Sequence, residues 1–406
     1  MRRITTLLLL VGILLGINNP ARAEAEVRVD VEVSHIFGQE ITIQGKIETE
    51  NQIQDLRVFI QSENDAIVTE SIPFSEDGEI SYTLDVTNQA IRAFSYLTIW
   101  FDVQLENDEI ITTPALDTYY YDDNRFDWQS ASAAEFTIHW YQPDNALGQK
   151  ILNAANEGLQ RIQNQIDVPR PQHVDIYAYS SAVDMQGTLA FSGQTAAWIA
   201  GHADPDLDLI VVSLPPGPDQ TLEIRRQIPH ELVHVLLYQK LGSGYQYLPR
   251  WLNEGLASTA ELFPNPDYEI LLSKAYERES LIPLDELCSS FPLDAASFQL
   301  SYAESYDFTW YLSQTYGKTK VDELIQTYAD GRGCEQGIET ALGTSLKKLN
   351  NDWRELKFGE NMMLKALNIF APWIFLAVIV LAAPVGWMVS GLSRKKARTS
   401  QSGSQP

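Results

Sequence analysis

The sequence predicts an α+β protein whose body is a small antiparallel β-sandwich followed by a mixed, increasingly helical domain. Short segments of alternating apolar and polar residues fill 26–105, which is typical of half-buried strands. Helical spacing dominates from about residue 222, and an apolar run lies near each end of the chain. The expected divisions are a signal peptide at 1–23, an immunoglobulin-like β-sandwich at 24–127, the mixed domain at 128–360, a transmembrane helix at 366–390 and a basic tail at 391–406.

The first residues have the composition of an export signal. Arg2 and Arg3 precede the apolar run Ile4–Ile17, and Ala21-Arg22-Ala23 has the small residues of a cleavage site. An uncleaved anchor is the alternative, but the run is short for a bilayer, which needs about 20 residues.

A second apolar run predicts one membrane crossing near the C-terminus. Ile369–Val389 contains no charged residue, and Arg394, Lys395, Lys396 and Arg398 follow it as a cytoplasmic basic flank would. A buried core helix is the alternative. We expect an exported body, extracellular or periplasmic, that a single C-terminal helix tethers to the cell membrane.

Charge excludes one class of partner. The chain has 29 basic and 54 acidic residues, and seven of the basic ones lie in the signal and the tail. The body therefore carries 22 basic residues, a formal charge of −32. Such a surface repels phosphate backbones, so we expect no nucleic-acid partner.

The sandwich is predicted from alternation that begins with Val27, Val29, Val31 and Val33. Further strand-like runs follow at Ile41–Ile47, Leu56–Ile60, Ile80–Val86 and Tyr96–Leu105. No cluster of potential ligands stands out, so a spacer role is favoured over a binding role.

A polar, tyrosine-rich connector at Asp117–Trp128 ends the sandwich. The mixed domain then begins with a strand, a helix whose apolar residues recur every three or four positions, a second strand and an apolar run. These elements are expected at Glu135–Trp140, Leu147–Ile166, Val174–Tyr179 and Leu209–Leu214.

The segment Pro229–Lys240, PHELVHVLLYQK, contains two histidines four residues apart. On a helix that spacing puts His230 and His234 on one face, while Glu231 projects about 100° away. Two imidazoles can then bind one Zn²⁺, and the glutamate can take a proton from water. A buried helix with structural histidines is the alternative. Pro229 leaves two options open, a helix that starts there or a longer, kinked one.

A third ligand is suggested by Trp251–Ala260, WLNEGLASTA, which resembles the ligand helix of gluzincin metallopeptidases such as the thermolysin and aminopeptidase N families. The resemblance implies that Glu254 completes a His-His-Glu zinc site. Ser301–Gly317 is similar to the aminopeptidase N helix whose tyrosine stabilises the oxyanion, which implies that role for Tyr302, with Tyr306 as the fallback.

The whole resemblance, over about 130–357, is to peptidase MA-like domains. It implies a thermolysin-like fold and a zinc metallopeptidase that hydrolyses peptide or protein substrates, with Glu231 as general base and Zn²⁺ as cofactor. The Gly-x-Met-Glu-Asn segment of the aminopeptidases is absent from the sequence, so exopeptidase specificity is not implied. An inactive, peptidase-like binding or scaffolding ectodomain is the alternative function. The sequence does not predict the oligomeric state.

The cysteines and the histidines outside the motif are expected to have roles other than metal binding. Cys288 and Cys334 lie in the exported body, which favours a disulfide over two free buried thiols. His35, His139, His173 and His202 are all expected to be structural or at the surface, and among them only His202, in the loop AGHADPD, is kept as a functional candidate. The segment Ala196–Val212 is the candidate edge strand for peptide binding.

Overall fold

The computed structural model describes residues 26–62, 65–89, 91–189, 200–359, 370–378 and 380. The chain divides into two compact units. Unit 1 comprises 1–126 with 188–195, and unit 2 comprises 127–187 with 196–406. The division falls after Phe126, one residue from the boundary expected from the sequence.

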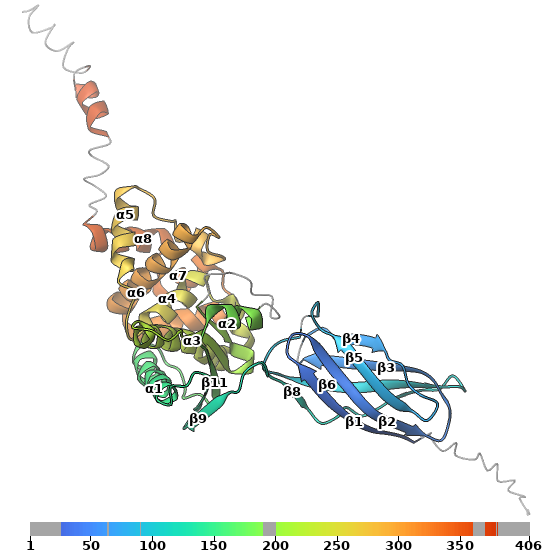
Figure 1. Ribbon diagram of the computed structural model, residues 1–406. Helices are drawn as coiled ribbons and strands as arrows, with labels where there is room; N and C mark the ends of the chain where they lie inside the picture. The colour runs from blue at the N-terminus through green and yellow to red at the C-terminus, as the bar shows by residue number, and fades with distance from the viewer. Residues whose placement is uncertain are drawn as a thin grey trace, which may run out of the picture. The chain divides into compact units, whose positions relative to one another are not determined.

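Unit 1 contains two antiparallel sheets, drawn mainly in blue in Figure 1. Alternate residues such as Ile41, Leu56 and Phe101 are fully buried, because successive side chains of a strand point to opposite faces. One sheet has the order β1 (Val27–Ile36), β2 (Glu40–Thr49) and β5 (Glu79–Asp85). The other has the order β4 (Val68–Ser71), β3 (Ile53–Ser62), β6 (Ser95–Leu105) and β7 (Ile110–Thr112), with β8 (Tyr119–Tyr121) paired to β6.

The expected connector at Asp117–Trp128 is wrong in part, because β8 lies within it. Tyr121 is fully buried, and its hydroxyl accepts a hydrogen bond from the Gly38 N–H at 2.9 Å. Tyr121 also pairs with Ser95 of β6. Polar neighbours conceal this short strand in the sequence, and only pairing with β6 defines it.

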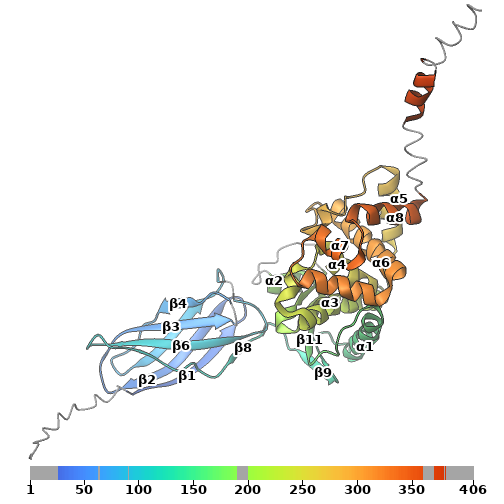
Figure 2. The ribbon, with the colours of Figure 1, turned by 180° about the vertical axis from the view of Figure 1, so that it is seen from behind.

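Unit 2 begins with a five-stranded sheet. Its order is β12 (Gly201–Asp204), β13 (Leu209–Ser213), β11 (Val174–Tyr179), β10 (Phe136–Trp140) and β9 (Gln129–Ala133). The three central strands are parallel, and each edge strand is antiparallel to its neighbour. Helices α1 (Leu147–Gln165) and α3 (Gln220–Leu241) pack against each other and the sheet, as Figure 2 shows from behind. Phe136, Ile176 and Val212 share their core.

The rest of the described part of unit 2 is mainly helical. Its elements are α2 (Ala182–Leu189), η2 (Pro205–Leu207), η3 (Gly242–Tyr247), α4 (Arg250–Ala260), α5 (Asp267–Glu277), η4 (Glu286–Cys288), α6 (Ala295–Ala329), α7 (Cys334–Leu342) and α8 (Leu346–Phe358). Gly255 lets α4 cross α6 closely, because a Cβ there would overlap Thr309 Oγ1 and the Ser305 carbonyl oxygen.

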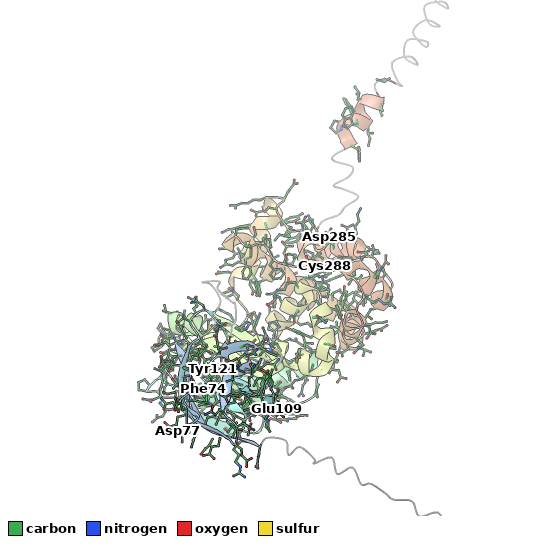
Figure 3. All side chains as sticks on the ribbon, turned by 90° about the vertical axis from the view of Figure 1, so that its right-hand side faces the viewer. Phe74, Asp77, Glu109, Tyr121, Asp285 and Cys288 are labelled. Carbon is green, nitrogen blue, oxygen red and sulfur yellow. A yellow bond between two sulfur atoms is a disulfide. The ribbon has the colours of Figure 1, made fainter. Side chains whose placement is uncertain are left out.

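One disulfide crosslinks the helical part. Cys288 and Cys334 are bonded, with their Cα atoms 6.1 Å apart, so η4 is tied to the start of α7. Figure 3 labels Cys288 together with Asp285, the residue just before η4. Of the alternatives left open by the sequence, the structure contains the disulfide.

The expected terminal segments lie largely outside the described residues. This applies to the signal peptide 1–23, the tail 391–406 and most of the expected span 366–390, of which only 370–378 and 380 are described, as helix. Within the described ranges, no helix is both long enough and apolar enough for a bilayer crossing.

Candidate metal centre

Helix α3 carries the two histidines of the motif. His230 and His234 are one turn apart, and their ring centroids are separated by 5.4 Å. Pro229 lies inside this helix, so the longer-helix option holds. Proline cannot donate to the Arg225 carbonyl, which accepts instead from the Leu262 N–H at 2.9 Å. The proline thereby frees a helix carbonyl that anchors the chain leaving α4.

Helix α4 brings the third side chain to the same point. Glu254 is 3% exposed, and its Oε2 lies 3.3 Å from His230 Nε2 and 3.8 Å from His234 Nε2. One potential ligand atom from each residue lies within 4.8 Å of the others. Within the described ranges, this is the only group of three or more such residues that could hold a metal ion.

The outer nitrogen of each imidazole has a partner. His230 Nδ1 lies 3.1 Å from Glu261 Oε1, and His234 Nδ1 lies 3.1 Å from Asn253 Oδ1. Tyr245 Oη is 3.2 Å from the latter nitrogen and accepts from Asn253 Nδ2 at 2.9 Å. An acceptor at Nδ1 holds a proton there, so in the neutral imidazole, the form that binds a metal, Nε2 carries the lone pair and faces the centre.

Electrostatics favour an ionised Glu254. Burial opposes its ionisation, yet Arg250 and the two histidines hold the pKa of Glu254 far below its usual value. Burial lowers the pKa of His234. His230 is also buried, but Glu254 and Glu261 raise its pKa well above the usual value.

The donor set suits Zn²⁺. Two imidazole nitrogens and one carboxylate oxygen are the ligands that zinc takes in open catalytic sites. Glu254 Oε2 is buried and accepts no well-aligned hydrogen bond from the described residues, which leaves a lone pair for a cation. Residues His230, His234 and Glu254 therefore fit the ion that the sequence predicts.

Glu231 follows His230 in α3 and lies close to the edge strand of the sheet. It is 8% exposed, and the backbone of Gly201 in edge strand β12 packs against its carboxylate. A Cβ at Gly201 would lie 2.7 Å from Glu231 Oε1. Glycine is thus required for the strand to approach the glutamate so closely.

Helix α6 presents Tyr302 to the centre. Its ring centroid is 6.0 Å from that of His230, and Phe291 and Phe298 pack around it. Burial, followed by Glu254, raises the pKa of Tyr302 well above its usual value, so the phenol keeps its proton. Tyr306, the fallback, packs instead against Tyr268 at 5.4 Å.

The family is decided by a match that spans this centre. The model of the peptidase MA superfamily matches residues 154–359, half of the chain, including α3 and α4. The chain belongs to the peptidase MA superfamily. Its peptidase MA region covers most of unit 2.

Solved structures that are similar to the chain share little sequence identity with it. The chain is similar to an M1 zinc metallopeptidase from Deinococcus radiodurans at 12% identity, covering 81% of this chain and 94% of that one with a TM-score of 0.32. A polysaccharide deacetylase, BC0361 from Bacillus cereus, is 10% identical, with coverage of 41% and 54% and a TM-score of 0.19. The chain thus spans about half of that deacetylase. No curated protein matches the sequence.

The other histidines of the described chain contact residues outside the metal centre. In unit 2, His139 and His173 both contact the Asp175 carboxylate, at 2.7 and 2.9 Å. His202 Nε2 is 3.6 Å from Asp204 Oδ1 in β12. His35 belongs to unit 1, where it contacts the Tyr119 hydroxyl at 2.6 Å.

Sequence reasoning missed the residues that orient the imidazoles. Asn253 is adjacent to Glu254. Glu261 follows Glu254 by about two helical turns, a spacing that puts both glutamates on the same face of a helix. That periodicity is a signal for Glu261 only, whereas Asn253 has only its place beside Glu254 in the sequence. Tyr245 gives no such signal, because it comes from η3 and reaches His234 only in the folded chain.

Proposed function

We propose that this protein is a membrane-anchored, extracytoplasmic zinc metallopeptidase. The observation that carries the proposal is the convergence of His230, His234 and Glu254 from two helices, with Glu231 directly beside them. Membership of the peptidase MA superfamily supports the peptidase class. An apolar core alone would not need three titratable side chains at one buried point.

His230, His234 and Glu254 would hold the ion. When bound, Zn²⁺ supplies Lewis-acid chemistry, which lowers the pKa of a water ligand to about 7 and polarises a carbonyl oxygen. Glu261 and Asn253 keep both Nε2 atoms directed inward. Arg250 Nη2 lies 3.0 Å from Glu254 Oε1, so the other carboxylate oxygen, Oε2, is the one that faces the imidazoles.

Glu231 is the proposed general base. Its carboxylate takes a proton from the attacking water as the oxygen bonds to the peptide carbonyl carbon. The same carboxyl group then gives that proton to the departing amide nitrogen, the C–N bond breaks, and a carboxylic acid and an amine leave. The protonated phenol of Tyr302 donates to the oxyanion that forms on the carbonyl oxygen.

The substrate is proposed to be an extended peptide lying along β12. This strand pairs with β13 on one side and is the edge of the described sheet on the other. A peptide added there would form main-chain hydrogen bonds close to Gly201 and so to Glu231. Of the expected segment Ala196–Val212, residues 196–199 lie outside the described ranges.

The proposed location follows from the two terminal sequences. An exported body would be cleaved after the signal peptide and retained by the apolar run Ile369–Val389, with the basic tail in the cytoplasm. Protease protection of the C-terminal tail in intact cells, but not of the body, is the expected result. Release of the intact protein as a soluble species would contradict the anchor.

The test of function uses the exported body with and without Glu231→Gln. We expect one zinc per chain in both proteins, and peptide cleavage only in the wild type. A wild type that contains no zinc would refute the metal centre. A zinc-loaded wild type that binds peptides without cleaving them would favour the alternative, an inactive binding or scaffolding module.

A further inference from the structure

Arg250 lies beside the metal centre. It is outside the HELVH motif, and the proposed mechanism gives it only a contact with Glu254. It is the first residue of α4, and its Nη2 lies 3.0 Å from Glu254 Oε1, one turn along the helix. Its guanidinium carbon is 5.7 Å from the centre of the Phe291 ring. A single carboxylate therefore separates this cation from the two imidazole nitrogens.

The guanidinium is only partly engaged. Arginine has five N–H donors in a fixed plane, and among the described residues Glu254 provides its one carboxylate partner. The Arg250 side chain is 45% exposed, whereas the Glu254 side chain is 4% exposed. Neutralising Glu254 does not require Arg250 to be exposed to solvent. The N–H groups of Arg250 that do not contact Glu254 can therefore donate to a group that arrives from solvent.

Tyr302 lies on the same side of the centre. Glu254 is the main cause that raises the pKa of Arg250, and the Tyr302 hydroxyl adds to it through direct interaction. Phe291 packs against both side chains, with its ring centroid 5.3 Å from that of Tyr302. The Phe291 ring therefore contacts both the Arg250 guanidinium and the ring that carries the Tyr302 hydroxyl group.

Several carboxyl groups lie at the centre. Those of Glu254 and Glu261 contact His230, and Glu231 is the next residue of α3. Peptide hydrolysis adds a further negative charge when the carbonyl π electrons move onto oxygen. A positioned guanidinium stabilises that charge more than it stabilises the neutral ground state, which is the condition for faster chemistry.

We propose that Arg250 is a second oxyanion donor, which acts with Tyr302 on the carbonyl oxygen of the scissile bond. This inference rests on the proposed peptidase function and extends it. An N–H of Arg250 donates to the oxygen as water adds to the carbon. When the C–N bond breaks the π bond re-forms, and Arg250 keeps its proton throughout.

The first experiment compares Arg250→Gln and Arg250→Lys with the wild type in zinc-loaded protein. We expect kcat to fall about 10² to 10³-fold in Arg250→Gln with little change in KM, because the donor acts in the transition state. Arg250→Lys retains charge and should keep part of the rate. Arg225→Gln is the matched control, since Arg225 is 39% exposed and its Nη1 is 3.0 Å from Glu157, outside the centre.

A binding measurement gives a second readout without turnover. In a Glu231→Gln background, a phosphinic peptide that mimics the anionic tetrahedral state should bind at least 10-fold more weakly after Arg250→Gln. The matching uncleaved peptide should bind equally to both proteins. Zinc content should stay at one per chain, because His230, His234 and Glu254 remain.

Three outcomes overturn the inference while leaving the peptidase proposal standing. The first is an active wild type whose kcat is unchanged by Arg250→Gln. The second is a loss of zinc in that variant, which would make Arg250 a positioning residue for Glu254. The third is a defect confined to peptides with a free C-terminal carboxylate and absent from their amides, which would assign Arg250 to substrate-end recognition. An inactive wild type refutes the peptidase proposal and this inference together.

Discussion

Gly201 lies so close to Glu231 that a single added carbon would touch the carboxylate. A Cβ at Gly201 would be 2.7 Å from Oε1 and 3.1 Å from Cγ of Glu231. The edge strand and the proposed general base therefore occupy complementary spaces, and neither can be enlarged without moving the other.

Gly201→Ala should displace Glu231 and lower kcat by about 10²-fold, because small errors in the position of a catalytic group are costly. The free energy of unfolding should change little, because β12 is at the edge of its sheet. The comparison is Gly217→Ala, where an added Cβ meets nothing within 4 Å. Equal kcat values for the two variants would contradict the packing argument.

Glu261→Ala should weaken zinc binding by about 10 to 100-fold, because it removes the acceptor that orients His230. Competition with a chromogenic chelator measures the affinity directly. Glu157→Ala provides the control, since Glu157 pairs with Arg225 at the surface. Unchanged zinc affinity in Glu261→Ala would show that helix α3 alone fixes the imidazole.

Glu304 should make stability depend on pH. Burial raises its pKa from the ordinary 4.5 to about 8, even though its Oε1 accepts from the Ile282 N–H at 2.8 Å. Between these values only the unfolded chain loses the proton, so the free energy of unfolding should fall as pH rises from 4.5 to about 8 and then level off.

Glu304→Gln removes this ionisation. Urea unfolding across that pH range should show a smaller loss of stability in the variant, and the variant should be the more stable protein near pH 8. A parallel decline in both proteins would assign the pH dependence to other groups.

Reduction of the Cys288–Cys334 disulfide should destabilise unit 2. The bond closes a loop with a sequence separation of 46, for which chain entropy gives a stabilisation of about 4 kcal/mol. Chemical unfolding with and without reductant measures the difference. The double variant Cys288→Ala, Cys334→Ala is the control, and reductant should leave its unfolding unchanged.

Local patterns predicted much of this fold. The helix at Leu147–Ile166 and the strand at Val174–Tyr179 follow from the spacing of apolar residues, and the structure has them at Leu147–Gln165 and Val174–Tyr179. Strand β12 lies within the expected edge segment Ala196–Val212 and forms the sheet edge. Strand β8 did not follow, because it is short, has polar neighbours and is defined by pairing with β6, which comes earlier in the chain.

The sequence by itself indicated the proposed ligand set. Residues four apart share one face of any helix, which places His230 beside His234, and Glu254 lies in a segment that resembles the family's ligand helix. Only the tertiary structure decided the surroundings. The contact of Arg250 with Phe291, the approach of Gly201 to Glu231 and the hydrogen bond that Pro229 allows between Arg225 and Leu262 all join separate elements. Helical periodicity acts over a few residues, whereas these contacts arise only when packing brings distant segments together.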